Sequence, residues 1–273
     1  MIFDISDYKF KRIFEDTFFH LPIRWDGRDF SETLSNLYDR YLDRLRLLLP
    51  KDYIKDIQRD CDLIIRAVNH QLNGFPSKAY NSMEKLMSRM IVSPVVDHFR
   101  NSIDVLQDGK SIELEPLYLF RATTVPDNQP YPRERIFHTP YNLRSCVSTN
   151  RYSIAGFPSL YLGTSLELCC EEIHLNPHKG FGIAARFEPN GYQMYQDRPI
   201  SFIDLAIKPQ DFLRIQVDNS SKKGRRVNEE TLLNPDARGA YLFWYPLIAA
   251  CSFIRVNRDT PFAAEYIIPQ LLM

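Results

Sequence analysis

The sequence predicts an α+β protein, with an α-helical N-terminal domain over residues 1–108 and a mostly-β domain over residues 109–273. Two observations support this division. Apolar residues recur at helical spacing through the first hundred residues, and short apolar runs bounded by Pro, Gly, Asn or Asp follow residue 109. Only two helical patterns separate roughly six strand candidates after that point, so a doubly wound parallel sheet is not expected.

The helical region is predicted from the period of its apolar residues. Residues 31–50 and 52–72 each carry such a pattern, and Pro50 is expected to end the first helix. Gly74 and Pro76 then precede a third predicted helix over 77–91. The apolar residues of the two patterns are Leu34, Leu37, Tyr38, Tyr41, Leu42, Leu45 and Leu48, and Ile54, Ile57, Cys61, Ile64, Ile65 and Val68.

An RNA-cleaving helical bundle is one alternative for this region, because such bundles carry an arginine and a histidine at fixed spacing on one helix. Arg66 and His70 come near that pattern, but their spacing is one residue short. Arg133 and His138 have the right spacing but lie in a proline-rich segment. This alternative predicts RNA cleavage that does not depend on Glu172, an acidic residue of the predicted mostly-β domain.

After Asp108-Gly109 the sequence favours strands. Strands are predicted over residues 114–124, 135–143, 158–164, 180–189, 200–207 and 249–256, each rich in β-branched, aromatic or small apolar residues. Helices are predicted over 165–175 and 209–218. A basic segment at 220–226 is predicted as an exposed loop, with a lid over an anionic ligand as the alternative.

Composition limits the classes of function. Lys+Arg and Asp+Glu both number 34, so the formal net charge is 0, which argues against a DNA-binding groove. No apolar run is long enough to cross a membrane, and the charged N-terminus lacks a signal-peptide core. The five cysteines are scattered without metal-ligand spacing, so we expect reduced thiols, a cytoplasmic protein and no metal site.

Residues 151–172, RYSIAGFPSLYLGTSLELCCEE, concentrate the residues that could do chemistry. Tyr161 ends a predicted strand, and Thr164 or Ser165 is a suitable N-cap for the helix that follows. Glu171 and Glu172 point about 100° apart on a helix, so one could face inward. An inward carboxylate near an arginine would suit a positively charged transition state; the alternative is an exposed, acidic helix end.

The order and spacing of these residues resemble the RES domain, a toxin family related to ADP-ribosyltransferases. Arg151 takes the position of the motif arginine, Tyr161 follows ten residues later, and Glu172 follows after eleven more. Ser252 fits the late serine, which we expect on a C-terminal strand. The resemblance covers roughly residues 115–273, and the helical N-terminal region resembles the one fused to larger RES proteins. Three positions depart from the pattern, namely Asn150, Tyr152 and Ser153, which stand where the family commonly has Gly, Trp and Asn.

The resemblance implies an ADP-ribosyltransferase-like fold that consumes NAD+ as a substrate, with no separate cofactor. Glu172 would stabilise the sugar cation, Arg151 would hold the pyrophosphate or the nicotinamide ribose, and Tyr161 would stack on the nicotinamide or ribose. Ser252 would place a hydroxyl against the substrate or Glu172. Catalytic roles therefore fall on Arg151, Tyr161, Glu172 and Ser252, and binding roles on Arg121, Tyr152, Gly156 and His138. Arg121 could equally be structural, and His138 could be an ordinary strand histidine.

The implied function is an NAD+-degrading toxin, a glycohydrolase or phosphorylase, acting in a toxin–antitoxin pair or in phage defence. Expected partners are NAD+ and an antitoxin or regulatory protein, and a homo-oligomer is compatible with the helical region. Transfer of ADP-ribose onto a protein and a catalytically silent binding module remain alternatives. In larger members of the family a further helix is expected beyond the point where this chain ends.

Overall fold

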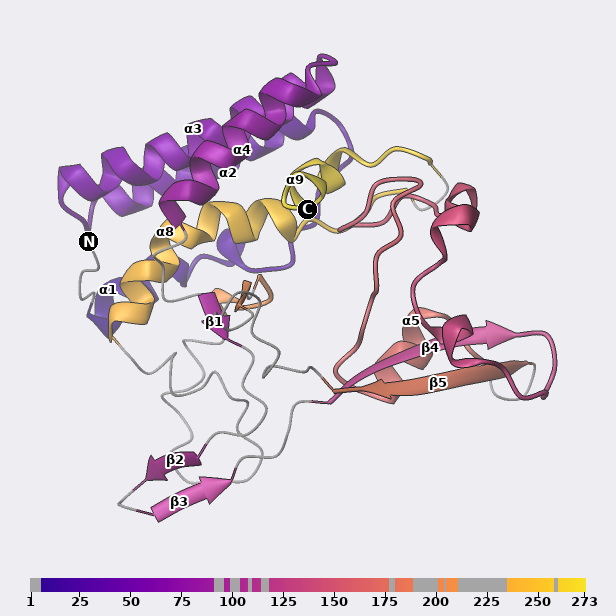
Figure 1. Ribbon diagram of the computed structural model, residues 1–273. Helices are drawn as coiled ribbons and strands as arrows, with labels where there is room; N and C mark the ends of the chain where they lie inside the picture. The colour runs from indigo at the N-terminus through magenta and orange to yellow at the C-terminus, as the bar shows by residue number, and fades with distance from the viewer. Residues whose placement is uncertain are drawn as a thin grey trace. The chain divides into compact units, whose positions relative to one another are not determined.

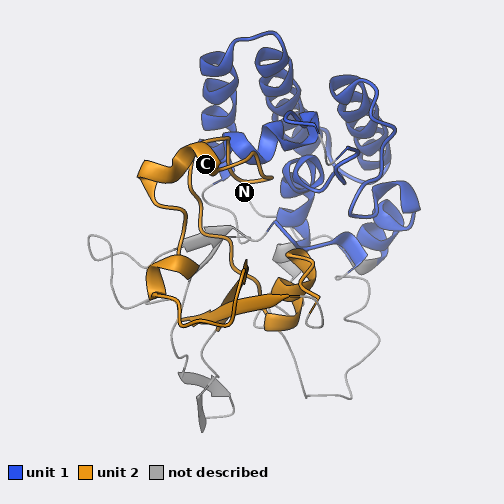
Figure 2. Cartoon of the chain, turned by 90° about the vertical axis from the view of Figure 1, so that its right-hand side faces the viewer, with its two compact units in different colours: residues 1–96, 203–273 blue, residues 97–202 orange. Residues whose placement is uncertain are grey.

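The computed structural model describes residues 6–90, 96–98, 104–107, 110–113, 118–176, 180–188, 201–203, 205–210, 235–257 and 260–273. The chain divides into two compact units, residues 1–96 with 203–273 and residues 97–202 (Figure 2). The C-terminal residues that the sequence suggested as part of a domain over 109–273 thus belong to the same unit as the N-terminal helices.

The N-terminal helices form as their apolar spacing predicts. They are α1 (Asp7–Phe14), α2 (Phe30–Arg46), α3 (Lys51–Leu72) and α4 (Pro76–Met90), with η1 (Thr17–Phe19) between the first two. The Asp29 carboxylate caps α2 by accepting from the Glu32 N–H at 2.9 Å. Pro50 precedes α3, and Gly74 follows it with φ +79°, a conformation that suits glycine.

A C-terminal helix, α8 (Pro235–Cys251), completes the core of this unit (Figure 1). Every side chain from Arg238 to Cys251 is buried except Phe243, which is half-buried. The hydroxyls of Tyr38 and Tyr41 donate to carbonyls of α8 at 2.8 and 2.9 Å. The predicted strand over 249–256 is therefore wrong in its first half. A helix that is apolar on all sides shows no 3.6-residue period by which to recognise it.

Beyond α8 the chain forms η4 (Ala264–Tyr266) and α9 (Ile267–Leu271), which join the same core. Before η4, Phe253 makes a parallel bridge with Ile23, with the Ile23 N–H donating to the Ser252 carbonyl at 3.1 Å. None of the helices in the described part of the chain is long and apolar enough to cross a membrane.

The second unit contains the antiparallel pair β4 (Leu119–Val125) and β5 (Phe181–Phe187), with Arg121 opposite Ala185 (Figure 1). The helix α5 (Leu166–Glu172) packs on β4. A hairpin pairs β2 (Asp104–Gln107) with β3 (Lys110–Glu113). The short strands β1 (Val96–His98) and β6 (Ser201–Ile203) form a third pair.

The mixture of helix and sheet is confirmed, but a mostly-β second half is not: all sheets among the described residues are two-stranded. The described parts of the strands predicted over 114–124 and 180–189 form β4 and β5, and part of the one predicted over 200–207 forms β6. The segment predicted as a strand over 135–143 instead contains parts of two 3-10 helices, η2 (Arg133–Ile136) and η3 (Tyr141–Cys146). Its Pro140 lacks the N–H that a sheet ladder needs.

The segment over 158–164 also forms no named strand, and only Gly163 bridges to Phe120. The helix predicted over 165–175 forms as α5. Most of the helix predicted over 209–218, and the whole basic segment 220–226, lie outside the described residues.

Candidate active site

The motif residues Arg121, Tyr152 and Tyr161 are joined by hydrogen bonds within the second unit. Arg121 lies in β4, and its Nη1 donates to the Tyr161 carbonyl at 3.1 Å. Its Nε is buried and has no hydrogen-bond partner within the described ranges. Burial lowers the pKa of this guanidinium, but the ordinary pKa of an arginine is so high that the group stays charged at neutral pH. Arg121 is therefore a half-buried cation whose Nε–H has no hydrogen-bond partner among the described residues.

Arg151 and Tyr152 form the tip of a tight turn. Asn150 and Ser153 bridge each other, with backbone N···O distances of 2.9 and 3.2 Å, so the two residues between them are the central pair of the turn. The Tyr161 hydroxyl accepts from the Tyr152 N–H at 3.2 Å and donates to Ser153 Oγ at 3.1 Å. Tyr161 thereby fixes the turn that presents Arg151.

Gly156 follows this turn and has a backbone conformation that favours glycine. Its φ is +80°, and its N–H donates to the Val147 carbonyl at 3.0 Å. An L side chain there would be strained by this φ, even though its Cβ would meet only the Arg144 carbonyl oxygen, at an ordinary contact distance of 3.9 Å. The glycine of the motif is thus needed to return the chain toward Tyr161.

Glu172 is the last residue of α5 and is exposed, as is Glu171. The expectation that one of the two faces inward is therefore wrong. A seven-residue helix with a single fully buried residue, Cys169, leaves both side chains in solvent. Ser165 caps the helix as predicted, its hydroxyl accepting from the Leu168 N–H at 3.1 Å.

A close contact attaches α5 to β4 and so positions Glu172. The Cys169 thiol donates to the Phe120 carbonyl at 3.1 Å, next to Arg121. A Cβ added at Gly163 would lie 2.6 Å from the Cys169 sulfur, so only glycine allows this approach. The contact relates the helix of Glu172 to the strand of Arg121.

His138 and Ser252 are not found on strands, contrary to prediction. His138 lies between η2 and η3, with Nδ1 2.8 Å from the Thr139 carbonyl and its ring against Phe137 and Tyr141. Ser252 directly follows α8 in the other compact unit, and its hydroxyl donates to the Ile248 carbonyl at 2.6 Å. Ser252 is not on a strand because α8 extends into the segment that was predicted to form the C-terminal strand.

Two residues that help to build the candidate site were not predicted from the sequence. Ser153, treated as a departure from the motif, is 1% exposed and receives the Tyr161 hydroxyl. Cys169 is predicted from the sequence only as one of five reduced thiols. Neither role has a signal in the sequence. The Cys169 thiol bonds a strand 49 residues earlier, and the Ser153 bond forms only once the chain has turned back toward Tyr161.

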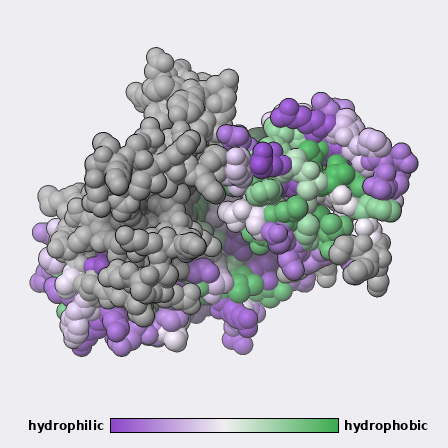
Figure 3. All heavy atoms as spheres, turned by 90° about the horizontal axis from the view of Figure 1, so that it is seen from below, coloured by the Kyte–Doolittle hydropathy of each residue, from purple (hydrophilic) through white to green (hydrophobic). Residues whose placement is uncertain are grey.

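Exposed apolar side chains lie on the same segments as the motif residues, and Figure 3 shows apolar groups on this part of the molecule, at the right of the view. Ile154 and Phe157 follow the Arg151 turn, and Leu166 and Leu168 belong to α5. The polar groups of the site are thus accompanied by apolar surface on which a ring could pack.

Comparison with known proteins gives a likeness to a protein named as a toxin. Over 260 residues the chain is 28% identical to a protein of Bacillus subtilis (strain 168) named "Putative toxin YopC", covering 93% of this chain and 54% of that protein. The chain therefore spans about half the length of this relative. No protein-family model matches the chain. No solved structure matches it either.

Proposed function

We propose that this chain is the NAD+-degrading part of a toxin, which cleaves the bond between nicotinamide and ribose. The observation that carries the proposal is the hydrogen-bonded group of Arg121, Tyr152, Ser153 and Tyr161, which holds Arg151 at the tip of a turn. The named relative supports the toxin role and the resemblance of the motif to the RES domain supports the substrate.

The cationic groups suit the anionic part of NAD+. Arg121 has an N–H to spare in a partly desolvated setting, and a guanidinium binds phosphate oxygens with two parallel donors. Arg151, on the neighbouring turn, would hold the same pyrophosphate or the nicotinamide ribose. The apolar surface beside the turn would receive the nicotinamide ring.

The reaction needs little from the protein besides charge and orientation. The C–N bond breaks with its electron pair going to nicotinamide, which leaves as a neutral molecule, and the ribose becomes an oxocarbenium-like cation. Glu172 would stabilise this cation and orient a ribose hydroxyl. Water or phosphate then adds its oxygen to the sugar carbon, water losing a proton as it does so. A strong general acid is not required.

Nicotinamide release from NAD+ by the purified chain, with and without phosphate, tests the proposal. We expect release that falls by about two to three orders of magnitude in Arg151→Ala and Glu172→Ala. The matched controls are Arg135→Ala and Glu171→Ala, which change exposed residues of the same types in the same unit. An increase with phosphate would identify a phosphorylase, and no change a glycohydrolase.

Two results would contradict the proposal. One is folded protein that binds NAD+ but releases no nicotinamide at high enzyme concentration. The other is release that is equally reduced by Glu171→Ala and Glu172→Ala, since a specific carboxylate role would then be lost.

A further inference from the structure

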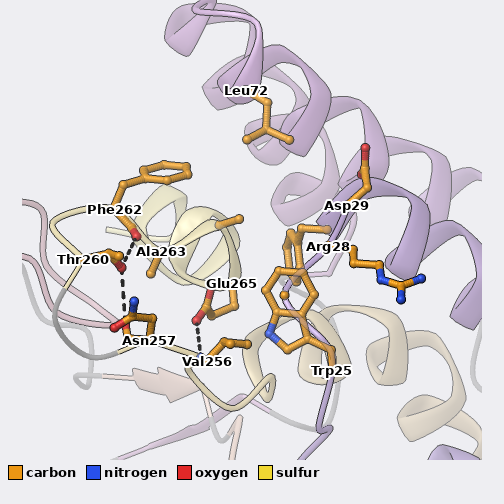
Figure 4. Close-up of a pocket in the computed structure, with 13 residues that line it drawn as sticks. Trp25, Arg28, Asp29, Leu72, Val256, Asn257, Thr260, Phe262, Ala263 and Glu265 are labelled. Atoms are coloured by element: carbon orange, nitrogen blue, oxygen red, sulfur yellow. Dashed lines mark hydrogen bonds between the residues drawn. The ribbon is translucent and has the colours of Figure 1, made fainter.

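A pocket in the helical unit has no part in the proposed chemistry. It has a volume of about 400 Å³ and lies between the loop that precedes α2 and the segment that follows α8 (Figure 4). Its walls include the aromatic rings of Trp25, Phe30 and Phe262, and its polar groups include Asp29 and Glu265. The volume suits one amino-acid side chain with part of its backbone.

Glu265 contributes a buried carboxylate to this pocket. The residue is 3% exposed, and its Oε1 accepts from the Val256 N–H at 3.1 Å. Within the described ranges, no Lys, Arg or His side chain lies within ion-pair distance of it. A buried carboxylate is costly unless a cation or several hydrogen bonds compensate it, and among the described residues one backbone N–H donates to Glu265.

Two arginines of the described ranges lie near the pocket, and both have other partners. Arg28 pairs with Asp26 at 3.2 Å, and its side chain is 87% exposed and extends away from Glu265 in Figure 4. Arg255 donates to the carbonyls of Asn257 and Thr260 at 2.9 and 2.6 Å. The described lining therefore presents uncompensated negative charge beside aromatic rings.

Trp25 adds a donor. Its indole Nε1 is buried and has no hydrogen-bond partner in the described part of the chain. Its ring packs edge-on against Phe30 with centroids 5.2 Å apart, which holds the indole in place. A ligand that satisfies both groups needs a cationic donor for Glu265 and a carbonyl acceptor for Trp25.

We propose that this pocket binds an arginine residue of a partner protein or peptide. The guanidinium would pair with Glu265, the aliphatic stem would pack on the aromatic walls, and a backbone carbonyl would accept from the Trp25 indole. The negative charge of Glu265 favours a cationic ligand over an anion. The Trp25 indole donor, which needs an acceptor, favours an arginine residue over a purely apolar group. The inference concerns a different unit from the proposed active site and does not depend on NAD+ cleavage.

The experiment uses the two tryptophans of the chain as reporters. The full chain, labelled with ¹⁵N, is titrated with Ac-Gly-Arg-Gly-NH₂ and with the citrulline peptide, which is a neutral isostere. We expect the indole signal of Trp25 to shift and that of Trp244, which is 1% exposed in the core, to stay unchanged. The arginine peptide should bind about tenfold more tightly than the citrulline peptide.

Variants separate a binding role of Glu265 from a structural one. Glu265→Gln retains the acceptor for the Val256 N–H but loses the charge, so it should fold and lose the preference for arginine over citrulline. Phe262→Ala, at a side chain 58% exposed, should weaken both peptides, and Tyr80→Ala on α4 should change neither.

Three results would overturn the proposal. They are an absent Trp25 shift, equal affinity for the arginine and citrulline peptides, and an arginine preference that persists in Glu265→Gln. A fourth comparison tests whether the guanidinium must belong to a peptide. If butylguanidinium bound as tightly as the arginine peptide, the ligand would be a free small cation, and a peptide partner would be contradicted.

Discussion

Tyr161 connects two segments of the candidate site through both its hydroxyl and its backbone carbonyl. Its hydroxyl joins the Tyr152 N–H and Ser153 Oγ, while its carbonyl receives Arg121. The strand carrying Arg121 and the turn carrying Arg151 therefore meet at one residue. Within the proposed function, Tyr161 acts as a positioning residue for both arginines, in addition to any stacking by its ring.

Removing only the hydroxyl tests this role. Tyr161→Phe removes the hydroxyl that bonds the Tyr152 N–H and the buried Ser153 hydroxyl, so we expect a loss of about 1–2 kcal/mol in the free energy of unfolding. We also expect a higher KM for NAD+, because Arg151 is no longer held in place. Denaturant unfolding and steady-state kinetics measure the two effects. Tyr141→Phe, at a side chain 61% exposed, is the control, and equal behaviour of both variants would rule out the positioning role.

Asp60 in α3 makes stability depend on pH. Burial raises the pKa of its carboxyl to about 6, against the opposing effect of Arg89, whose Nε lies 3.1 Å from Oδ1 in an ion pair without hydrogen-bond alignment. The folded state thus binds the proton more tightly than the unfolded state does. Stability contributed by this group is fully present below about pH 4 and is lost as the pH rises through about 6.

Asp60→Asn should remove this pH dependence. The wild-type free energy of unfolding should contain a decrease on the order of 3 kcal/mol between about pH 4 and pH 7 that the variant lacks. Urea unfolding at several pH values measures the difference between the two proteins. Asp62→Asn, which changes an exposed carboxylate on the same helix, controls for the loss of one charge. Parallel curves for wild type and Asp60→Asn would contradict the raised pKa.

At the level of the element, α8 contains a proline that a helix interior would not ordinarily tolerate. Pro246 has no N–H, so the carbonyl of Leu242, four residues earlier, loses its helical partner. The Tyr41 hydroxyl of α2 donates to that carbonyl at 2.9 Å. A defect in one helix is therefore compensated by a side chain of another, in the buried core.

A double-mutant cycle tests this compensation. Tyr41→Phe should cost about 2 kcal/mol in the free energy of unfolding, because the buried Leu242 carbonyl then has no donor. In a Pro246→Ala background the backbone N–H restored at that position can donate to the carbonyl, so the same change should cost less than about half as much. Chemical denaturation of the four proteins gives the coupling energy. Strictly additive effects would mean that the proline and the tyrosine act independently.

At the scale of the whole molecule, the sequence predicts those elements that are determined by residues close together in the chain. The period of Leu34, Leu37 and Leu45 predicts α2 because each turn of that helix has one buried face. The helix α8 has no polar face to contrast with, so the sequence around Cys251 resembles a strand. The resemblance of the motif to the RES domain implies a shared site for Arg151 and Tyr161. The pocket of Trp25 and Glu265 could not be predicted, because it joins segments more than two hundred residues apart.

The packing of the C-terminal helices on the N-terminal ones predicts which fragments of the chain can fold by themselves. Residues of α2 and α3 share one core cluster with Tyr241–Phe253 of the C-terminal segment, and Tyr38, Tyr41 and Tyr245 make buried hydrogen bonds across it. A fragment of residues 1–96 would expose this apolar face and lose its hydrogen-bond partners. We therefore expect the fragment to lack a cooperative thermal transition and to bind a hydrophobic dye.

Adding residues 203–273 as a separate chain should restore the transition, since it supplies α8 and α9. Circular dichroism during heating, at several ratios of the two fragments, measures the recovery. The corresponding control is residues 97–202, which lack these helices and should have no effect. If residues 1–96 unfolded cooperatively on their own, at a temperature unchanged by the C-terminal fragment, the helices α1–α4 would form an independent domain. Helix α8 would then be an addition to their surface, and its complete burial would need another explanation.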